Sequence, residues 1–174
     1  MTAAYRLDAP AMEVAQVLGC YAAGDPWPGG EVVPGGYAPV MIADREKGRH
    51  LVPRMWGVPP PRGDYLVPFA RNLDSPFWVG VLRHTGFRCI VPMTAIRRAR
   101  DWWIPPGNAI SACAGIWRDS EIPSFAILTT GAAEGQPGGL PIALGPRACE
   151  TWLRADIREA RALVEAAPTA FLAP

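Results

Sequence analysis

Arginine and tryptophan residues lie close together in two parts of this sequence, and their side chains are the strongest candidates for chemistry. The residues concerned are Trp56, Arg71, Arg97, Arg98, Arg100, Trp102 and Trp103. Guanidinium groups bind phosphates, and exposed aromatic rings stack on unpaired bases. The pattern therefore indicates single-stranded nucleic-acid binding. The same residues also fit a plainer interpretation, in which the tryptophans belong to the core and the arginines to the solvated surface.

Catalytic motifs are scarce by comparison. The two histidines are His50, in a charged turn, and His84, near a predicted helix end, and we expect both to be exposed. The sequence has no glycine-rich phosphate loop, no nucleophile elbow and no zinc-protease motif. A hydrolase that depends on a histidine general base is therefore not indicated.

The four cysteines are widely spaced and form no C-x-x-C pair. We therefore expect neither a metal site nor a cofactor. The chain begins without an apolar signal core and has no apolar run long enough to cross a membrane, so we expect a cytoplasmic protein with no membrane partner. Reduced thiols follow from that location, and Cys89 and Cys113 lie in apolar strand patterns that predict burial.

Composition favours one folded domain over residues 1–174. Hydrophobic residues make up 49% of the 174 residues, and the 18 glycines and 20 prolines are scattered between apolar runs. The net charge is only +1, so binding to nucleic acid requires a local basic patch.

Apolar runs and turn residues predict an α+β domain in which a strongly bent or barrel-like mixed sheet is flanked by helices. We predict a first helix from Pro10 to about Gly24, with Val14, Val17, Leu18 and Tyr21 on one face. Two further helices are predicted over 75–83 and 146–164, and residues 95–108 are expected to be irregular. The predicted strands cover 38–42, 51–58, 87–93, 109–117, 124–130 and 140–144.

Seven short segments, taken in order, resemble motifs of the SRAP family, the SOS-response-associated peptidases or abasic-site-processing proteins. They are Met55–Pro59, Phe69–Trp78, Phe87–Pro92, Ala114–Trp117, Phe125–Thr130, Leu140–Leu144 and Trp152–Leu153. The matches cover about residues 37–153 and leave 154–174 as a helical extension and tail. The resemblance implies an SRAP-like fold, a role in DNA damage or the SOS response, and single-stranded or abasic DNA as partner.

The positions that carry the family's chemistry are changed in this sequence, although Arg71 of the DNA-facing pocket is kept. The cysteine nucleophile, asparagine, glutamate and histidine of the family correspond to Thr2, Phe69, Arg98 and Gln136 or Pro137. Without the thiol no thiazolidine can form with an abasic site, so the resemblance implies a pseudoenzyme. An amino-terminal Thr2 leaves open a weaker route through an imine and an oxazolidine.

We therefore expect noncovalent DNA binding, and the candidate residues are Trp56, Arg71, Arg98, Trp102 and Thr130. One alternative is that the fold is reused for a small anionic or apolar ligand, in a closed pocket lined by Phe69, Arg98 and Thr130. Another is a protein-interaction or structural role. For Arg71 itself, the alternative to an anion site is a salt bridge to Asp74 or Glu134.

Overall fold

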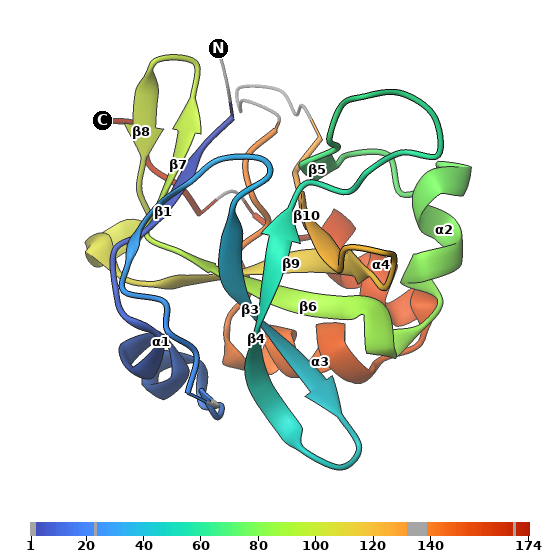
Figure 1. Cartoon of the computed structure of the whole chain (residues 1–174), viewed down its shortest axis with the longest axis horizontal. Helices are drawn as coiled ribbons and strands as arrows, with labels where there is room; N and C mark the ends of the chain where they lie inside the picture. The colour runs from blue at the N-terminus through green and yellow to red at the C-terminus, as the bar shows by residue number, and fades with distance from the viewer. Residues whose placement is uncertain (1–2, 23, 132–138, 169) are drawn as a thin grey trace.

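Five strands close into a β-barrel in the computed structural model, which describes every residue except 1–2, 23, 132–138 and 169. The strand order is β4-β3-β6-β9-β10, and β10 returns to pair with β4 (Figure 1). The barrel strands are β3 (Tyr37–Asp44), β4 (Gly48–Trp56), β6 (Arg88–Met93), β9 (Ser111–Arg118) and β10 (Ser124–Leu128). Neighbours run antiparallel except for the parallel β10–β4 pair. The single α+β domain with a barrel-like mixed sheet that the sequence predicts is confirmed.

The barrel has a defined end at which several elements meet. Because β10 runs parallel to β4, both strands finish at this end, and β5 (Phe69–Ala70) pairs in parallel with the last residues of β10. Every residue of β6 and β10 is buried, which explains their uninterrupted apolar runs, since both faces of these strands are covered.

A second, smaller sheet covers the same end of the barrel. It has the order β2-β1-β7-β8 and is antiparallel throughout. Its strands are β1 (Tyr5–Leu7), β2 (Gly30–Val32), β7 (Ala95–Arg98) and β8 (Asp101–Trp103). Tyr5 of β1 packs edge-on against Trp56, the last residue of β4, with ring centroids 4.9 Å apart. The prediction that residues 95–108 are irregular is wrong for 95–103, which form the β7–β8 hairpin.

The first two helices agree only in part with the sequence predictions. Helix α1 (Ala11–Leu18) ends at Gly19, whose left-handed φ of 64° stops it well before Gly24. Its buried face includes Val14, whereas Val17 and Tyr21 are 56% and 70% exposed, so the predicted apolar face is wrong. Helix α2 (Pro76–Leu82) is confirmed, and the Ser75 hydroxyl accepts a hydrogen bond from its first turn.

The predicted closing helix is two helices, α3 (Pro146–Arg154) and α4 (Ile157–Glu165). Asp156 separates the two helices, because its carboxylate accepts a hydrogen bond from the backbone N–H of Glu159 at 2.9 Å and so caps the start of α4. Residues 140–144 form only isolated bridges, not the predicted strand. The tail returns to the small sheet, where Phe171 is buried and Leu172 pairs with Ile104. The extension after residue 153 therefore belongs to the same core.

The barrel and α3 are joined by reciprocal hydrogen bonds. The Nε1 of Trp152 in α3 donates to the carbonyls of Cys89 and Gly115 on adjacent barrel strands, at 3.0 and 3.2 Å. In return, the fully buried Arg88 of β6 donates to the carbonyls of Leu82, Trp152 and Ala155 at the ends of α2 and α3. These motif residues therefore hold the fold together.

Two motif glycines are also explained by packing. A Cβ on Gly115 would lie 2.7 Å from Val91 Cγ2 and 2.8 Å from Cys89 Sγ, across neighbouring strands. Gly57 has a φ of 99°, and a Cβ there would lie 2.8 Å from the Leu66 side chain. Only glycine fits either position without rearrangement.

Candidate nucleic-acid interface

Trp56 lies at the centre of the barrel end, but in the core. Its side chain is 0% exposed, and its Nε1 donates to the Pro68 carbonyl at 3.0 Å. The ring is held edge-on between Tyr5 and Phe69, with centroids 4.9 and 5.6 Å away. The prediction that Trp56 stacks on bases is therefore wrong, because no face of the ring reaches solvent.

Arg71 follows β5 at the rim of this barrel end and is exposed. Its guanidinium lies 5.7 Å from the Phe69 ring centroid, and within the described residues it forms no ion pair. The alternative salt bridge to Asp74 is not formed, because Asp74 instead pairs with Arg161 of α4 at 2.7 Å. Glu134, the other partner considered, lies outside the described residues. Arg71 is therefore available to an anion.

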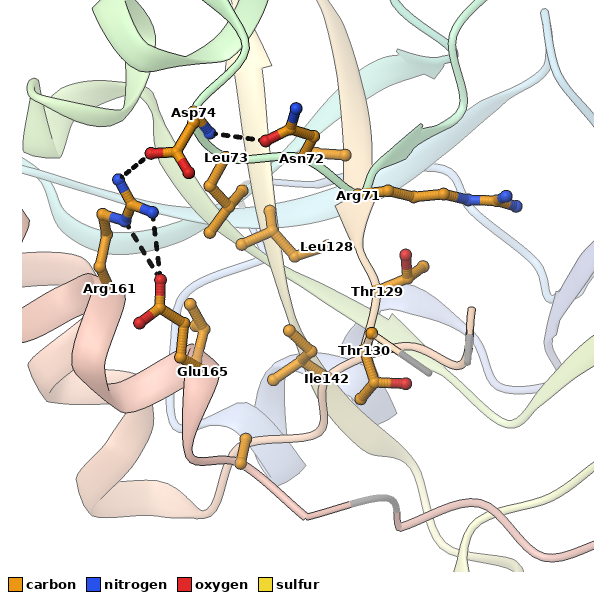
Figure 2. A pocket seen from close by; sticks show the side chains of 14 residues that line it. Arg71, Asn72, Leu73, Asp74, Leu128, Thr129, Thr130, Ile142, Arg161 and Glu165 are labelled. Carbon is orange, nitrogen blue, oxygen red and sulfur yellow. Dashed lines mark hydrogen bonds and ion pairs between the residues drawn. The ribbon is translucent and has the colours of Figure 1, made fainter. Parts of the chain in front are cut away.

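A pocket with a volume of about 450 Å³ lies beside Arg71 (Figure 2). Its walls come from the segment after β5, the end of β10 and helix α4. Thr129 and Thr130 line it, and both hydroxyl oxygens are buried with no hydrogen-bond partner among the described residues. Such groups ordinarily have partners, so the pocket offers unused hydrogen-bonding capacity.

An ion cluster occupies the opposite side of this pocket. The Arg161 guanidinium donates from Nη1 to Asp74 and from Nε and Nη2 to Glu165 (Figure 2). The hydrogen bond from Arg161 holds the pKa of Asp74 below its usual range. The side chains of Asp74 and Glu165 are 75% and 59% exposed. The Asp74 carboxyl therefore stays ionised at neutral pH, and the side chains of Asp74 and Glu165 both line the pocket.

The arginines of the β7–β8 hairpin lie on its two opposite faces. On one face, the guanidinium groups of Arg6 and Arg97 lie 4.1 and 5.6 Å from the centroid of the Trp102 ring. Glu31 of β2 forms ion pairs with both of these arginines, at 3.8 and 4.0 Å. Trp102 is only partly buried and lies beside two cations, so its predicted part in DNA binding stays a prediction.

Arg98 lies on the other face of the hairpin. Side chains alternate along a strand, so Arg98 shares a face with the buried Ile96, whose register partner in β1 is Tyr5. The Arg98 guanidinium lies 5.5 Å from the Trp103 ring centroid. Arg98 therefore extends from the face that covers the barrel end.

The sequence-predicted site residues are only partly brought together. Arg71 and Thr130 line one pocket, whereas Phe69 and Arg98 are absent from its lining. Thr2, Gln136 and Pro137 lie outside those residues. Sequence reasoning missed Arg6 and Arg161, because their roles depend on partners such as Asp74, 87 positions from Arg161.

Other candidate chemistry is absent from the part of the chain that the structure describes. In these ranges no cluster of three or more histidine, cysteine or acidic residues could hold a metal ion. His50 is 6% exposed, not exposed as expected, because its ring packs inward and contacts Gly48 and Asp44. His84 is exposed, as predicted. Cys89 and Cys113 are buried free thiols, also as predicted.

Comparisons with known proteins define the fold. No protein-family model matches this chain, and no curated protein matches it either. Solved structures share its closed-barrel α+β architecture, with TM-scores up to 0.75 and 16% identity. No helix within the described ranges is long and apolar enough to cross a membrane.

Three of these solved structures come from two bacteria, and each protein is 16% identical in sequence to this chain. A protein from Bordetella bronchiseptica has a TM-score of 0.75, with 98% of this chain and 97% of that chain covered. A phage-related protein from the same organism has a TM-score of 0.74, with 99% and 92% covered. A protein from Bacteroides thetaiotaomicron has a TM-score of 0.71, with 98% and 90% covered. At this identity the comparison establishes the fold alone.

Proposed function

We propose that this chain binds single-stranded DNA, intact or abasic, through its sugar–phosphate backbone at the barrel end, as an SRAP-like protein without covalent crosslinking. The observation that carries the proposal is Arg71, an exposed cation beside a pocket with unused hydrogen-bonding groups. Its acidic neighbour Asp74 is already engaged by Arg161, so the charge of Arg71 is left for a phosphate.

The β7–β8 hairpin supports the same surface. Tyr5 of the small sheet packs on Trp56 at the barrel end, which places the hairpin and β5 at one end of the molecule (Figure 1). Arginines outnumber carboxylates there. The arginines are Arg6, Arg71, Arg97, Arg98, Arg100 and Arg161, and the carboxylates are Glu31, Asp74, Asp101 and Glu165. A local basic surface of this kind supports backbone binding despite a net charge of only +1.

The residues at the positions that match the family's catalytic residues do not support covalent crosslinking. Thr2 has no thiol to trap an aldehyde, and Arg98 replaces a proton-shuttling carboxylate with a cation. A cation facing the barrel end favours phosphate binding in place of acid–base work.

The test is binding of a fluorescein-labelled ten-nucleotide single strand, measured by anisotropy across a sodium chloride series. Arg71→Ala should weaken binding and reduce the salt slope by about 0.7, as for one lost single-strand phosphate contact. The matched control is Arg45→Ala, an exposed arginine in the β3–β4 turn at the opposite end of the barrel. Equal salt slopes for both variants would contradict the proposal.

A second readout tests the absence of crosslinking. After incubation with an abasic single strand, a denaturing gel should contain no heat-stable shifted band. A band that disappears when the amino terminus is blocked would establish the Thr2 route instead. If no strand binds at any salt concentration, the small-ligand or protein-partner alternative replaces DNA binding.

A further inference from the structure

We propose that the pocket beside Arg71 receives one nucleobase of the bound strand, and that it selects bases with an exocyclic amino group. This inference rests on the proposed function, because Arg71 is taken to hold the phosphate of the same nucleotide. The volume of about 450 Å³ lies within the range of about 300–1,000 Å³ that small-molecule pockets occupy.

The walls of the pocket suit the flat face of a base. Leu128, Ile142 and Val164 line it, and each is at most 3% exposed. They offer an aliphatic surface to an aromatic ring. Thr129, itself 5% exposed, adds a buried hydroxyl that has no partner in the described part of the chain. A pocket that combines apolar walls with unsatisfied polar groups is organised for a ligand that is flat and polar at its edge.

The charged residues of the lining indicate that the pocket binds a neutral group and that an anion binds beside it. Arg71 and Arg161 are balanced by Asp74 and Glu165 within the lining, so a free anion gains no net attraction in the pocket. Figure 2 shows Arg71 extending away from the ion cluster, on the side of Thr129. A nucleotide meets both conditions, because its neutral base is joined through one sugar to a charged phosphate.

The free hydrogen-bonding positions of the cluster are acceptors. The donors of Arg161 are directed to Oδ1 of Asp74 and Oε1 of Glu165. In the described ranges no group donates to the second oxygen of either carboxylate. These two oxygens accept from an amino group of cytosine, adenine or guanine, whereas the carbonyl at the same position of uracil offers only an acceptor.

The experiment compares three ten-nucleotide strands on the full chain: oligodeoxycytidine, oligodeoxyuridine and a strand of tetrahydrofuran abasic units. Cytosine and uracil differ at C4 in the amino group that the pocket is expected to select. We expect the cytidine strand to bind several-fold more tightly than the uridine strand, because the cytosine amino group donates to a carboxylate oxygen, whereas the uracil carbonyl at the same position repels it. The abasic strand should bind most weakly.

A pocket-filling variant and its control complete the test. Gly131 lines the pocket, and a Cβ built on it meets nothing within 4 Å, so Gly131→Phe adds a ring there without a backbone clash. It should lower the affinity for the cytidine strand to that of the abasic strand. Gly80→Phe, at an equally open glycine in α2 that is not in the lining, should bind like the wild type.

The outcomes separate this inference from the proposed function. Equal affinity for the cytidine and abasic strands, with both weakened by Arg71→Ala, would overturn the base pocket and leave backbone binding intact. Failure of all three strands to bind would overturn both. If Gly131→Phe does not fold, the wild-type ratio between the three strands decides the question.

Discussion

Replacing Arg88 with methionine should cause a large loss of stability. The side chain is 0% exposed, and burial lowers the pKa of its guanidinium. Its Nε and Nη2 donate to the Leu82 carbonyl at 3.2 and 3.1 Å, and its Nη1 donates to Trp152 at 3.0 Å and to Ala155. No carboxylate within the described residues forms an ion pair with it.

The expected magnitude follows from these contacts. A buried carbonyl that loses its partner costs about 1–3 kcal/mol, so the three carbonyls together cost about 3–9 kcal/mol. Removing a buried charge that forms no direct ion pair among the described residues returns several kcal/mol of desolvation free energy, less the attraction of Arg88 to Asp156. The net loss should be about 3–5 kcal/mol, a large share of the 5–15 kcal/mol that stabilises an ordinary domain.

The assay is equilibrium urea denaturation followed by tryptophan fluorescence. With an m-value of about 2 kcal/mol/M, Arg88→Met should lower the midpoint by about 1.5–2.5 M. Arg88→Lys should fall between this variant and the wild type, because an ammonium keeps the charge but lacks the planar fork. The control is Arg154→Met, whose side chain is 70% exposed and should matter by less than about 0.5 kcal/mol. A change below about 1 kcal/mol for Arg88→Met would refute the reasoning.

Three further predictions concern packing and titration. Gly115→Ala should cost about 1–3 kcal/mol in urea denaturation because its Cβ overlaps two neighbouring side chains. The control Gly80→Ala, with open space around it in α2, should be neutral or slightly stabilising. Trp56→Phe should lower the melting temperature through loss of its buried hydrogen bond and leave the affinity and salt slope for single-stranded DNA unchanged. Burial raises the pKa of the Cys113 thiol from 9.0 to about 12, so its stabilising contribution is complete below about pH 9 and is lost as pH rises towards 12. Cys113→Ala should flatten this alkaline decline in the free energy of unfolding, and a thiol reagent at pH 8 should label the half-buried Cys20 before Cys113.

The barrel strands were predictable because their burial leaves a plain sequence pattern. The runs that became β6 and β9 are apolar over five or more residues, and the run of β10 is apolar over four. Proline or polar turns bound all three. The small sheet was not predictable in the same way. Strands of three residues such as Tyr5–Leu7, with Arg6 facing out, are too short to establish a period of two.

The boundary between α3 and α4 is marked in the sequence by a helix-capping pattern. Asp156 followed three residues later by Glu159 is typical of a helix start, and reading it as such would have divided the closing helix correctly. The uninterrupted apolar face from Cys149 to Val164 concealed it.

The candidate site was predictable at Arg71 and not at Trp56, for a physical reason. Tryptophan next to a proline run fits an exposed platform and a buried ring equally well, and only the partners Tyr5 and Phe69 distinguish the two. The segments that resemble motifs of the SRAP family include Trp56, Arg88 and Gly115, which serve packing. Their agreement therefore predicts the fold more strongly than it predicts any activity.

The parallel pairing of β10 with β4 has a consequence for how the molecule forms. Ser124 pairs with Met55, and Ile127 with Phe69, so the ends of the barrel meet only after a long intervening stretch of chain has been ordered. Contacts of such wide sequence separation pay a large loop-closure entropy and slow folding. The same closure brings Thr129 and Thr130 beside Arg71. The pocket therefore exists only once β10 has paired, and a chain interrupted before β10 contains Arg71 without the β10 wall beside it.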